Sequence, residues 1–266
     1  MHIIDTHNHS LPGIDDGAKD LAMALAMLHA AEAAGTKEVV LTPHHLNGAY
    51  INHADFIQQQ VSRLDAAAKS NGINVVLHAA SEVHLTPETV EHLVEYKALS
   101  YCGLGKAALI ELPKSDIPNG VEAILSELLS HGITPIIAHP ERNTPLRVDF
   151  SRLRDWVNMG CKAQLTGQSC TGAFGVQLQK SSLAMISNGL IHLVASDAHR
   201  PSGRSPNLQQ AAEFLTAFYD AQVCQTLLVD NPARLISGRD LVLCKPVESG
   251  KEHPAKSWWQ RLVRLD

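Results

Sequence analysis

The chain has 266 residues, of which 45% are apolar and 18% are charged, and its formal net charge is −5 at neutral pH. This is a globular composition, and we favour one large domain over two small ones. The sequence contains no run of lysine or arginine that could form a nucleic-acid-binding face. We expect neither a transmembrane span nor a signal peptide. Its five scattered cysteines lack a C-x-x-C pair, which is typical of reduced thiols in a cytoplasm.

Apolar, β-rich runs alternate with segments of helical periodicity. The predicted strand and helix pairs are 2–6 with 19–34, 38–42 with 53–70, 73–79 with 86–95, 107–112 with 119–131, 133–138 with 146–159, 161–165 with 176–188, and 191–195 with 205–219. This alternation predicts parallel strands joined by helices, and in one domain it favours a barrel over an open sheet. We therefore predict an α/β fold, a (β/α)7 TIM-like barrel over residues 1–240. Residues 241–266 are predicted to be a linker and a short tail.

Residues that can bind metal recur at the ends of the predicted strands, where a βα barrel has its active face. They are His7, His9, His44, Glu82, Glu111, His139, Asp197 and His199, with Gln164 at one further strand end. Core histidines would not follow strand ends in this way, so the pattern predicts a metal cluster.

The spacing of these residues supports the same interpretation. Residues two apart in an extended segment point to the same side, so His7 and His9 can bind one ion, as can Asp197 and His199. Asp16 could merely shape the turn before the first helix, but beside so many ligands we favour a ligand. This set exceeds what one tetrahedral zinc can use, which implies more than one ion, and nitrogen and oxygen donors without thiolate suit manganese, iron or zinc.

Two arginines, Arg142 and Arg204, lie on loops that also carry predicted metal ligands. A guanidinium group is a planar bidentate clamp for phosphate oxygens, although either arginine could instead pair with an acid nearby. Metal ions combined with arginines indicate a phosphoesterase. No cysteine is followed six positions later by arginine, so the sequence lacks the phosphate loop of cysteine-dependent phosphatases.

Several motifs together resemble a known superfamily. They are Asp5-x-His7-x-His9, the segment 11–17 with its Asp15-Asp16-Gly17, Thr42-Pro43-His44, Glu82 after an apolar strand, Glu111, His139-Pro140-Glu141-Arg142, the segment 164–175 with its Thr171-Gly172-x-Phe174-Gly175, and Ser196-Asp197-x-His199. From residue 2 to about residue 235 the chain resembles the polymerase and histidinol phosphatase (PHP) superfamily. More narrowly, it is similar to the manganese-dependent bacterial protein-tyrosine phosphatases of capsule and exopolysaccharide operons.

The resemblance implies a distorted (β/α)7 barrel with three divalent metal ions, foremost manganese, with Glu82 bridging two of them. The implied ligand groups are His7, His9, Glu82 and Asp197; Glu82, Glu111 and His139; and Asp16, His44 and His199. Arg142 and Arg204 would hold the phosphoryl oxygens while a metal-bridging hydroxide attacks phosphotyrosine directly. The implied partner is the tyrosine-rich C-terminal tail of a membrane-bound polysaccharide autokinase, and the implied location is the cytoplasm.

The residues leave two other functions open. One is a small-molecule phosphoesterase of the same superfamily, for example one that acts on histidinol phosphate. The other is a non-catalytic, metal-stabilised domain, against which the complete ligand set argues. The sequence also leaves open whether the protein forms a homo-oligomer and whether Trp258 and Trp259 pack on the barrel, at an oligomer contact or on a membrane surface.

Overall fold

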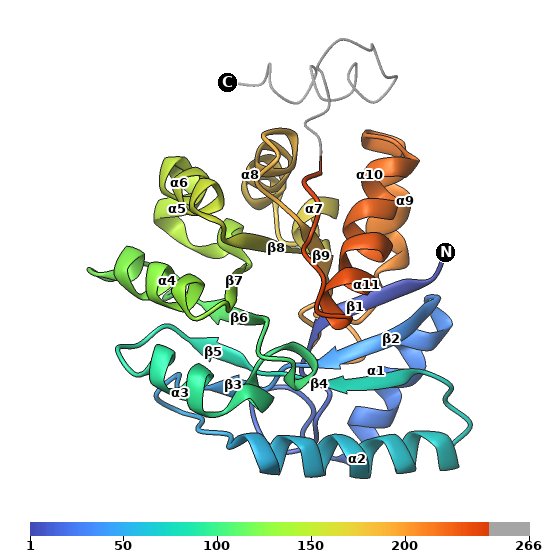
Figure 1. Cartoon of the computed structure of the whole chain (residues 1–266). Helices are drawn as coiled ribbons and strands as arrows, with labels where there is room; N and C mark the ends of the chain where they lie inside the picture. The colour runs from blue at the N-terminus through green and yellow to red at the C-terminus, as the bar shows by residue number, and fades with distance from the viewer. Residues whose placement is uncertain (245–266) are drawn as a thin grey trace.

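The computed structural model describes residues 1–244, in which helices surround a set of parallel strands (Figure 1). The strands are β1 (Ile3–Asn8), β2 (Thr36–Leu41), β3 (His44–His45), β4 (Val76–Ala79), β5 (Glu82–His84), β6 (Ala107–Glu111), β7 (Thr134–Ala138), β8 (Lys162–Thr166) and β9 (Leu193–Ala195). Within these residues no helix is both long enough and apolar enough to cross a bilayer.

Two of the seven strand positions hold two short strands each, and the second of each pair, β3 or β5, lies beyond the predicted ranges 38–42 and 73–79. The order β1-β2-β4 continues into β3-β5-β6-β7-β8-β9, because β3 follows β2 and β5 follows β4 directly along the chain. Pro43 lacks the N–H that the ladder needs between β2 and β3. Between β4 and β5, the Ser81 N–H turns away to the carbonyl oxygen of Leu99 at 3.0 Å. These breaks distort the barrel on this side.

The ring closes between the last strand and the first. Asn8 and Ala198 form a parallel bridge, the His9 N–H donates to the Ala198 carbonyl at 2.9 Å, and the Asp197 N–H donates to the His7 carbonyl at 2.8 Å. Closure therefore falls where the two predicted metal-binding motifs lie. The predicted α/β barrel is confirmed, including its seven strand positions within residues 1–244.

The helices lie outside the strands (Figure 1). They are α1 (Leu21–Ala33), α2 (Ala54–Ser70), α3 (Thr89–Glu95), α4 (Val121–Ser130), α5 (Thr144–Val148), α6 (Ser151–Met159), α7 (Gly167–Thr171), α8 (Val176–Ser187), α9 (Gln209–Phe218), α10 (Ala221–Gln225) and α11 (Asn231–Ile236). Short turns η1 (Lys97–Leu99), η2 (Tyr101–Gly103), η3 (Pro140–Arg142) and η4 (Thr226–Asp230) complete the fold. The single helix predicted over 146–159 is two, α5 and α6.

Alternation along the strands divides the core into two layers. Leu109 and Ile136 belong to an inner cluster, whereas their neighbours Ile110 and Ile137 face the helices. Leu235 of α11 and Leu241 join the inner cluster beside residues that begin strands. The chain after β9 thus covers the N-terminal end of the barrel, leaving the C-terminal end for the polar residues. The domain division at residue 240 stays a prediction, and the predicted tail lies largely outside the described residues.

Candidate metal centre

The predicted ligands gather at the C-terminal ends of the strands. Three groups have ligand atoms within 4.8 Å of one another: His9, Asp16, His44 and His199; His7, His9 and Glu82; and His44, Glu82 and Glu111. Glu82 belongs to two of these groups, which agrees with the bridging position that the sequence resemblance implies. All of these residues except the half-exposed Asp16 are shielded from solvent.

Two further predicted ligands contact these groups. The Asp197 Oδ1 atom lies 3.4 Å from the Nε2 atoms of both His7 and His9. The His139 Nε2 atom lies 2.8 Å from Glu82 Oε1 and 3.9 Å from Glu111 Oε1. The structure therefore brings all nine predicted ligands into one cluster, in which the group that contains both Glu82 and Glu111 is completed by His44, whereas the resemblance implies His139.

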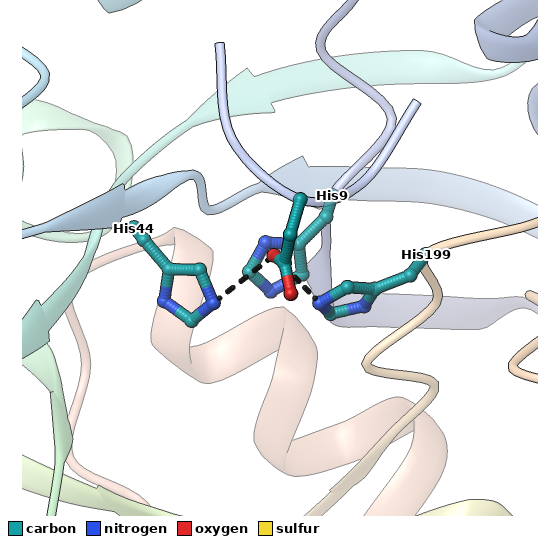
Figure 2. Close-up of side chains that lie close together, drawn as sticks. His9, His44 and His199 are labelled. Carbon is teal, nitrogen blue, oxygen red and sulfur yellow. Dashed lines mark ion pairs between the residues drawn. The ribbon is translucent and has the colours of Figure 1, made fainter. Parts of the chain in front are cut away.

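The outer part of the cluster is a carboxylate held between two imidazoles. Asp16 Oδ1 lies 3.3 Å from His44 Nε2 and 3.2 Å from His199 Nε2, and Figure 2 shows these two rings converging in front of His9. The rings of His9 and His199 lie 4.0 Å apart between centroids. Three imidazoles lie this close together around one carboxylate. A divalent ion bound by neutral imidazoles fits this arrangement better than protonated rings, which would repel one another.

The electrostatics of the cluster couple its imidazoles to its carboxylates. Burial would lower the pKa of His44, but the carboxylates of Asp16 and Glu82 override burial and raise it to about 10. For His199, burial and the charge on His9 dominate and lower the pKa to about 4. Despite burial, neighbouring histidines and arginines hold the pKa values of Glu82 and Asp197 well below their ordinary range. The carboxylates are thus ionised and ready to bind cations.

Several buried ligand atoms have no hydrogen-bond partner among residues 1–244. They are Glu82 Oε2, Asp197 Oδ1, His44 Nδ1 and His199 Nε2. An unpaired buried polar atom is costly, and the exceptions in a native protein call for an ion or a similar partner. Since each of these atoms faces other predicted ligands, the donor set fits divalent metal ions.

The backbone at two predicted ligands adopts the left-handed region. His139 has φ of 31° and Asp197 has φ of 49°. Residues with side chains rarely take such values, and they persist where the surrounding structure imposes them, often at functional sites. The turns after β7 and β9 therefore hold these side chains in place at a conformational cost.

Residues behind the ligands orient them, and the sequence did not assign these roles. Asp15 Oδ2 accepts from His9 Nδ1 at 2.7 Å and from the His44 N–H at 3.2 Å. Gln164 Nε2 contacts His7 Nδ1 at 2.9 Å. Such contacts fix the ring nitrogen that faces a metal. The sequence shows two adjacent carboxylates, Asp15 and Asp16, near the site. It does not show which of them binds a metal and which one orients a ligating histidine.

Both predicted arginines contact the same carboxylate at the cluster. Arg142 Nη1 and Arg204 Nη2 both donate to Asp197 Oδ2, the second at 2.8 Å. Arg142 Nη2 and Arg204 Nε are buried and without a partner among the described residues. Two guanidinium groups with unused donors next to a metal cluster form a site for a tetrahedral oxyanion.

The cysteines do not offer an alternative nucleophile. All five are free thiols, and four are buried. Burial raises the pKa of the Cys102 thiol to about 11 and that of the Cys161 thiol to about 12. Reactive cysteines need a lowered pKa and access to solvent, so these thiols serve packing.

The barrel and its cluster define the class of the protein as a metal-dependent hydrolase. The chain belongs to the family described as "Capsular polysaccharide synthesis, CpsB/CapC", whose profile matches residues 3–237. The tyrosine-protein phosphatase YwqE of Bacillus subtilis is 33% identical over 90% of this chain and 93% of its own length. The tyrosine-protein phosphatase CpsB of Streptococcus pneumoniae is 30% identical over 88% of this chain and 98% of its own.

Solved structures agree. A structure reported for YwqE of Bacillus subtilis and CpsB of Streptococcus pneumoniae, described as "unique metal-dependent tyrosine phosphatases", matches with a TM-score of 0.86 and 32% identity, covering 92% of this chain and all of that chain. The phosphotriesterase of Mycobacterium tuberculosis matches with a TM-score of 0.53 and 13% identity, over 88% of this chain and 94% of that chain. The latter shows a shared fold only. The predicted membership of the bacterial tyrosine phosphatases of capsule operons is confirmed, and the PHP superfamily is consistent with it.

Proposed function

We propose that this protein is a metal-dependent protein-tyrosine phosphatase, a phosphoric monoester hydrolase. The observation that carries the proposal is that Arg142 and Arg204 both donate to Asp197 Oδ2 and keep unused donors, in a cluster where Glu82 Oε2 and Asp197 Oδ1 lack hydrogen-bond partners. Relatives at 30–33% identity that bear the name tyrosine-protein phosphatase support this function over the histidinol-phosphatase-like alternative.

The chain's own residues bind and orient the phosphate ester. Arg142 and Arg204 take two phosphoryl oxygens, and their positive charge stabilises the charge that develops during transfer. Asp197 keeps both guanidinium groups in position through its Oδ2 atom, while its Oδ1 atom points toward His7 and His9. Bound divalent ions would supply a water of lowered pKa and polarise the phosphoryl group. With the cysteines protonated, no phosphocysteine forms.

We further propose three divalent ions, with manganese as the physiological metal and iron or zinc as alternatives, held by the ligand groups given above. The proposed substrate is the C-terminal tyrosine cluster of a membrane-bound polysaccharide autokinase, and the proposed location is the cytoplasm. The family's description as a capsular polysaccharide synthesis family supports this partner.

The experiment is a substrate panel. Protein loaded with manganese is given a phosphotyrosine peptide, a phosphoserine peptide and histidinol phosphate, and the release of inorganic phosphate is measured. We expect turnover to favour phosphotyrosine, to stop with EDTA and to return with manganese. A preference for histidinol phosphate would replace the proposed function with that of a small-molecule phosphoesterase, and no turnover on any ester would make the domain non-catalytic.

A further inference from the structure

Two half-buried aromatic side chains stand next to the metal centre and have no part in the chemistry described so far. The Phe174 ring lies on the loop between α7 and α8, and its centroid is 5.1 Å from the Arg142 Cζ atom. The Tyr50 ring lies on the loop between β3 and α2, with its centroid 6.3 Å from the His44 ring and an angle of 11° between the planes. Each ring therefore borders a different part of the predicted site.

The loops that carry the two rings follow strands on different sides of the barrel. Tyr50 follows β3, and Phe174 follows β8 and the short helix α7. Around the barrel in one direction, β1 and β9 lie between β3 and β8; in the other direction, β5, β6 and β7 lie between them.

Local structure fixes Phe174 in its place. The glycines on either side of its loop, Gly172 and Gly175, have φ of 85° and 98°, values that side chains rarely adopt. A Cβ atom at Gly172 would lie only 3.0 Å from Gln179 Oε1, and Gln179 itself is tied to the Cys170 carbonyl by a hydrogen bond of 3.0 Å. The loop is thus built to present the one residue between these glycines that has a large side chain.

We propose that Phe174 and Tyr50 form the two walls of an aryl-binding slot that makes the site selective for phosphate esters of aromatic alcohols. This inference rests on the proposed phosphatase function and deepens it. Because a guanidinium donates in its own plane, the Phe174 ring can cover the face of Arg142 and leave its Nη2 donor for a phosphoryl oxygen. The aryl group of the ester then extends along Phe174.

Each ring has an exposed apolar residue close to it in the sequence. Ile51 is 62% exposed and Val176 is 45% exposed. They offer contact surface to whatever is attached to the aryl group, as in a peptide that carries phosphotyrosine. An alkyl phosphate, such as phosphoserine, is too short to reach these residues and has no aromatic face for the two rings.

The test compares the binding of two phosphonates that cannot be hydrolysed, phenylphosphonate and methylphosphonate, by titration calorimetry of manganese-loaded protein. They share the charged group and differ in the ring. An aromatic contact accounts for roughly a 3- to 10-fold change in affinity. Phe174→Ala should therefore weaken the binding of phenylphosphonate by about that factor and leave the affinity for methylphosphonate unchanged. Phe174→Tyr and Tyr50→Phe, which keep the rings, should retain wild-type affinities, and Tyr50→Ala should repeat the selective loss with metal content unchanged.

Phe150 offers a matched control. It is also half-buried and also covers a guanidinium, that of Arg154 at 5.7 Å, but at the start of α6. Phe150→Ala should change neither affinity. Equal weakening of both phosphonates in Phe174→Ala would overturn the proposal, because Phe174 would then only support Arg142, and so would unchanged affinity for phenylphosphonate. Neither result depends on turnover, so the outcome is independent of whether the wild-type protein hydrolyses phosphotyrosine.

Discussion

At the residue scale, the metal centre consists of side chains that contact one another at the strand ends and of side chains behind them that orient the imidazole rings. The rule that active residues follow strand ends locates His44, Glu82 and His139, which the structure brings within contact of one another. It does not tell Asp15 from Asp16, because the difference lies in where the backbone points each carboxylate. Asp15 turns inward to His9, and Asp16 turns outward to His199.

The role of Arg204 can be separated from metal binding. Loss of one preorganised donor that stabilises the transition state typically lowers turnover on the order of 100- to 1000-fold, which we expect for Arg204→Ala on a phosphotyrosine peptide. Arg204→Lys should recover part of this loss, since lysine keeps the charge but lacks the planar fork. Metal content, measured by elemental analysis, should equal that of the wild type. If metal is lost along with activity, Arg204 supports Asp197 and does not clamp phosphate.

Asp15 should act on metal affinity. Replacing a carboxylate that orients a ligating histidine typically weakens metal binding 10- to 100-fold, so Asp15→Asn should require that much more manganese for half-maximal activity. The control is Asp65→Asn on α2, because Asp65 pairs with Lys69 at the surface, far along the chain from the predicted ligands. Wild-type manganese dependence in Asp15→Asn would show that the contact with His9 does not hold the ligand.

At the element scale, strands and helices follow from hydrophobic periodicity, whereas their interruptions depend on single backbone groups. The break between β2 and β3 comes from the missing N–H of Pro43, and this motif was visible in the sequence. The split between β4 and β5 depends on a long-range hydrogen bond from Ser81 to Leu99, which no local pattern reveals. Elements that rest on such contacts cannot be predicted from one segment alone.

The loop after β1 should tolerate no side chain at Gly17. A Cβ atom there would lie 2.0 Å from the His9 carbonyl oxygen, so the loop must move away from a predicted ligand. We expect Gly17→Ala to lower both metal content and phosphatase activity while circular dichroism retains the barrel's signature. Gly35→Ala is the control, since open space surrounds its Cβ position and any effect should be on stability alone. Full metal content in Gly17→Ala would contradict the close packing of this loop.

His192, at the residue before β9, should make stability depend on pH. Burial and the charge of Lys162 lower its pKa to about 3, below the ordinary value of 6.5. Between pH 6.5 and 3 the unfolded chain binds the proton more readily, so the contribution is complete above pH 6.5 and is lost as the pH falls towards 3. His192→Asn keeps an acceptor for the Ala163 N–H, 3.4 Å from Nδ1 in the wild type, but cannot titrate. Its unfolding free energy should fall less steeply in this window, by up to about 1.4 kcal/mol per pH unit. Parallel curves from urea melts would refute this.

At the scale of the whole molecule, the number of strand positions and the parallel order follow from the sequence, but the closure of the ring does not. Closure depends on hydrogen bonds between His7, His9 and the segment Asp197–Ala198, which are far apart in sequence. His7, His9 and Asp197 are also predicted metal ligands, so the contact that closes the barrel also forms part of the metal centre. A ligand that binds both ends of the chain should therefore stabilise the entire barrel.

This coupling predicts a thermal stability that depends on metal. A ligand present at 100 times its dissociation constant stabilises the native state by about 2.7 kcal/mol, and for a chain of this size each kcal/mol shifts the melting temperature by roughly 2–4 °C. We expect manganese to raise the melting temperature of EDTA-stripped protein by about 5–10 °C in scanning calorimetry. Asp197→Ala should lose most of this increment, because it removes a predicted ligand at the closure. Arg152→Ala, which removes a surface pair with Glu122 and a contact with the Trp156 ring, should keep it. If manganese restored activity without raising the melting temperature, the ions would bind a ring that is already closed and rigid without them, and the metal centre would serve catalysis alone.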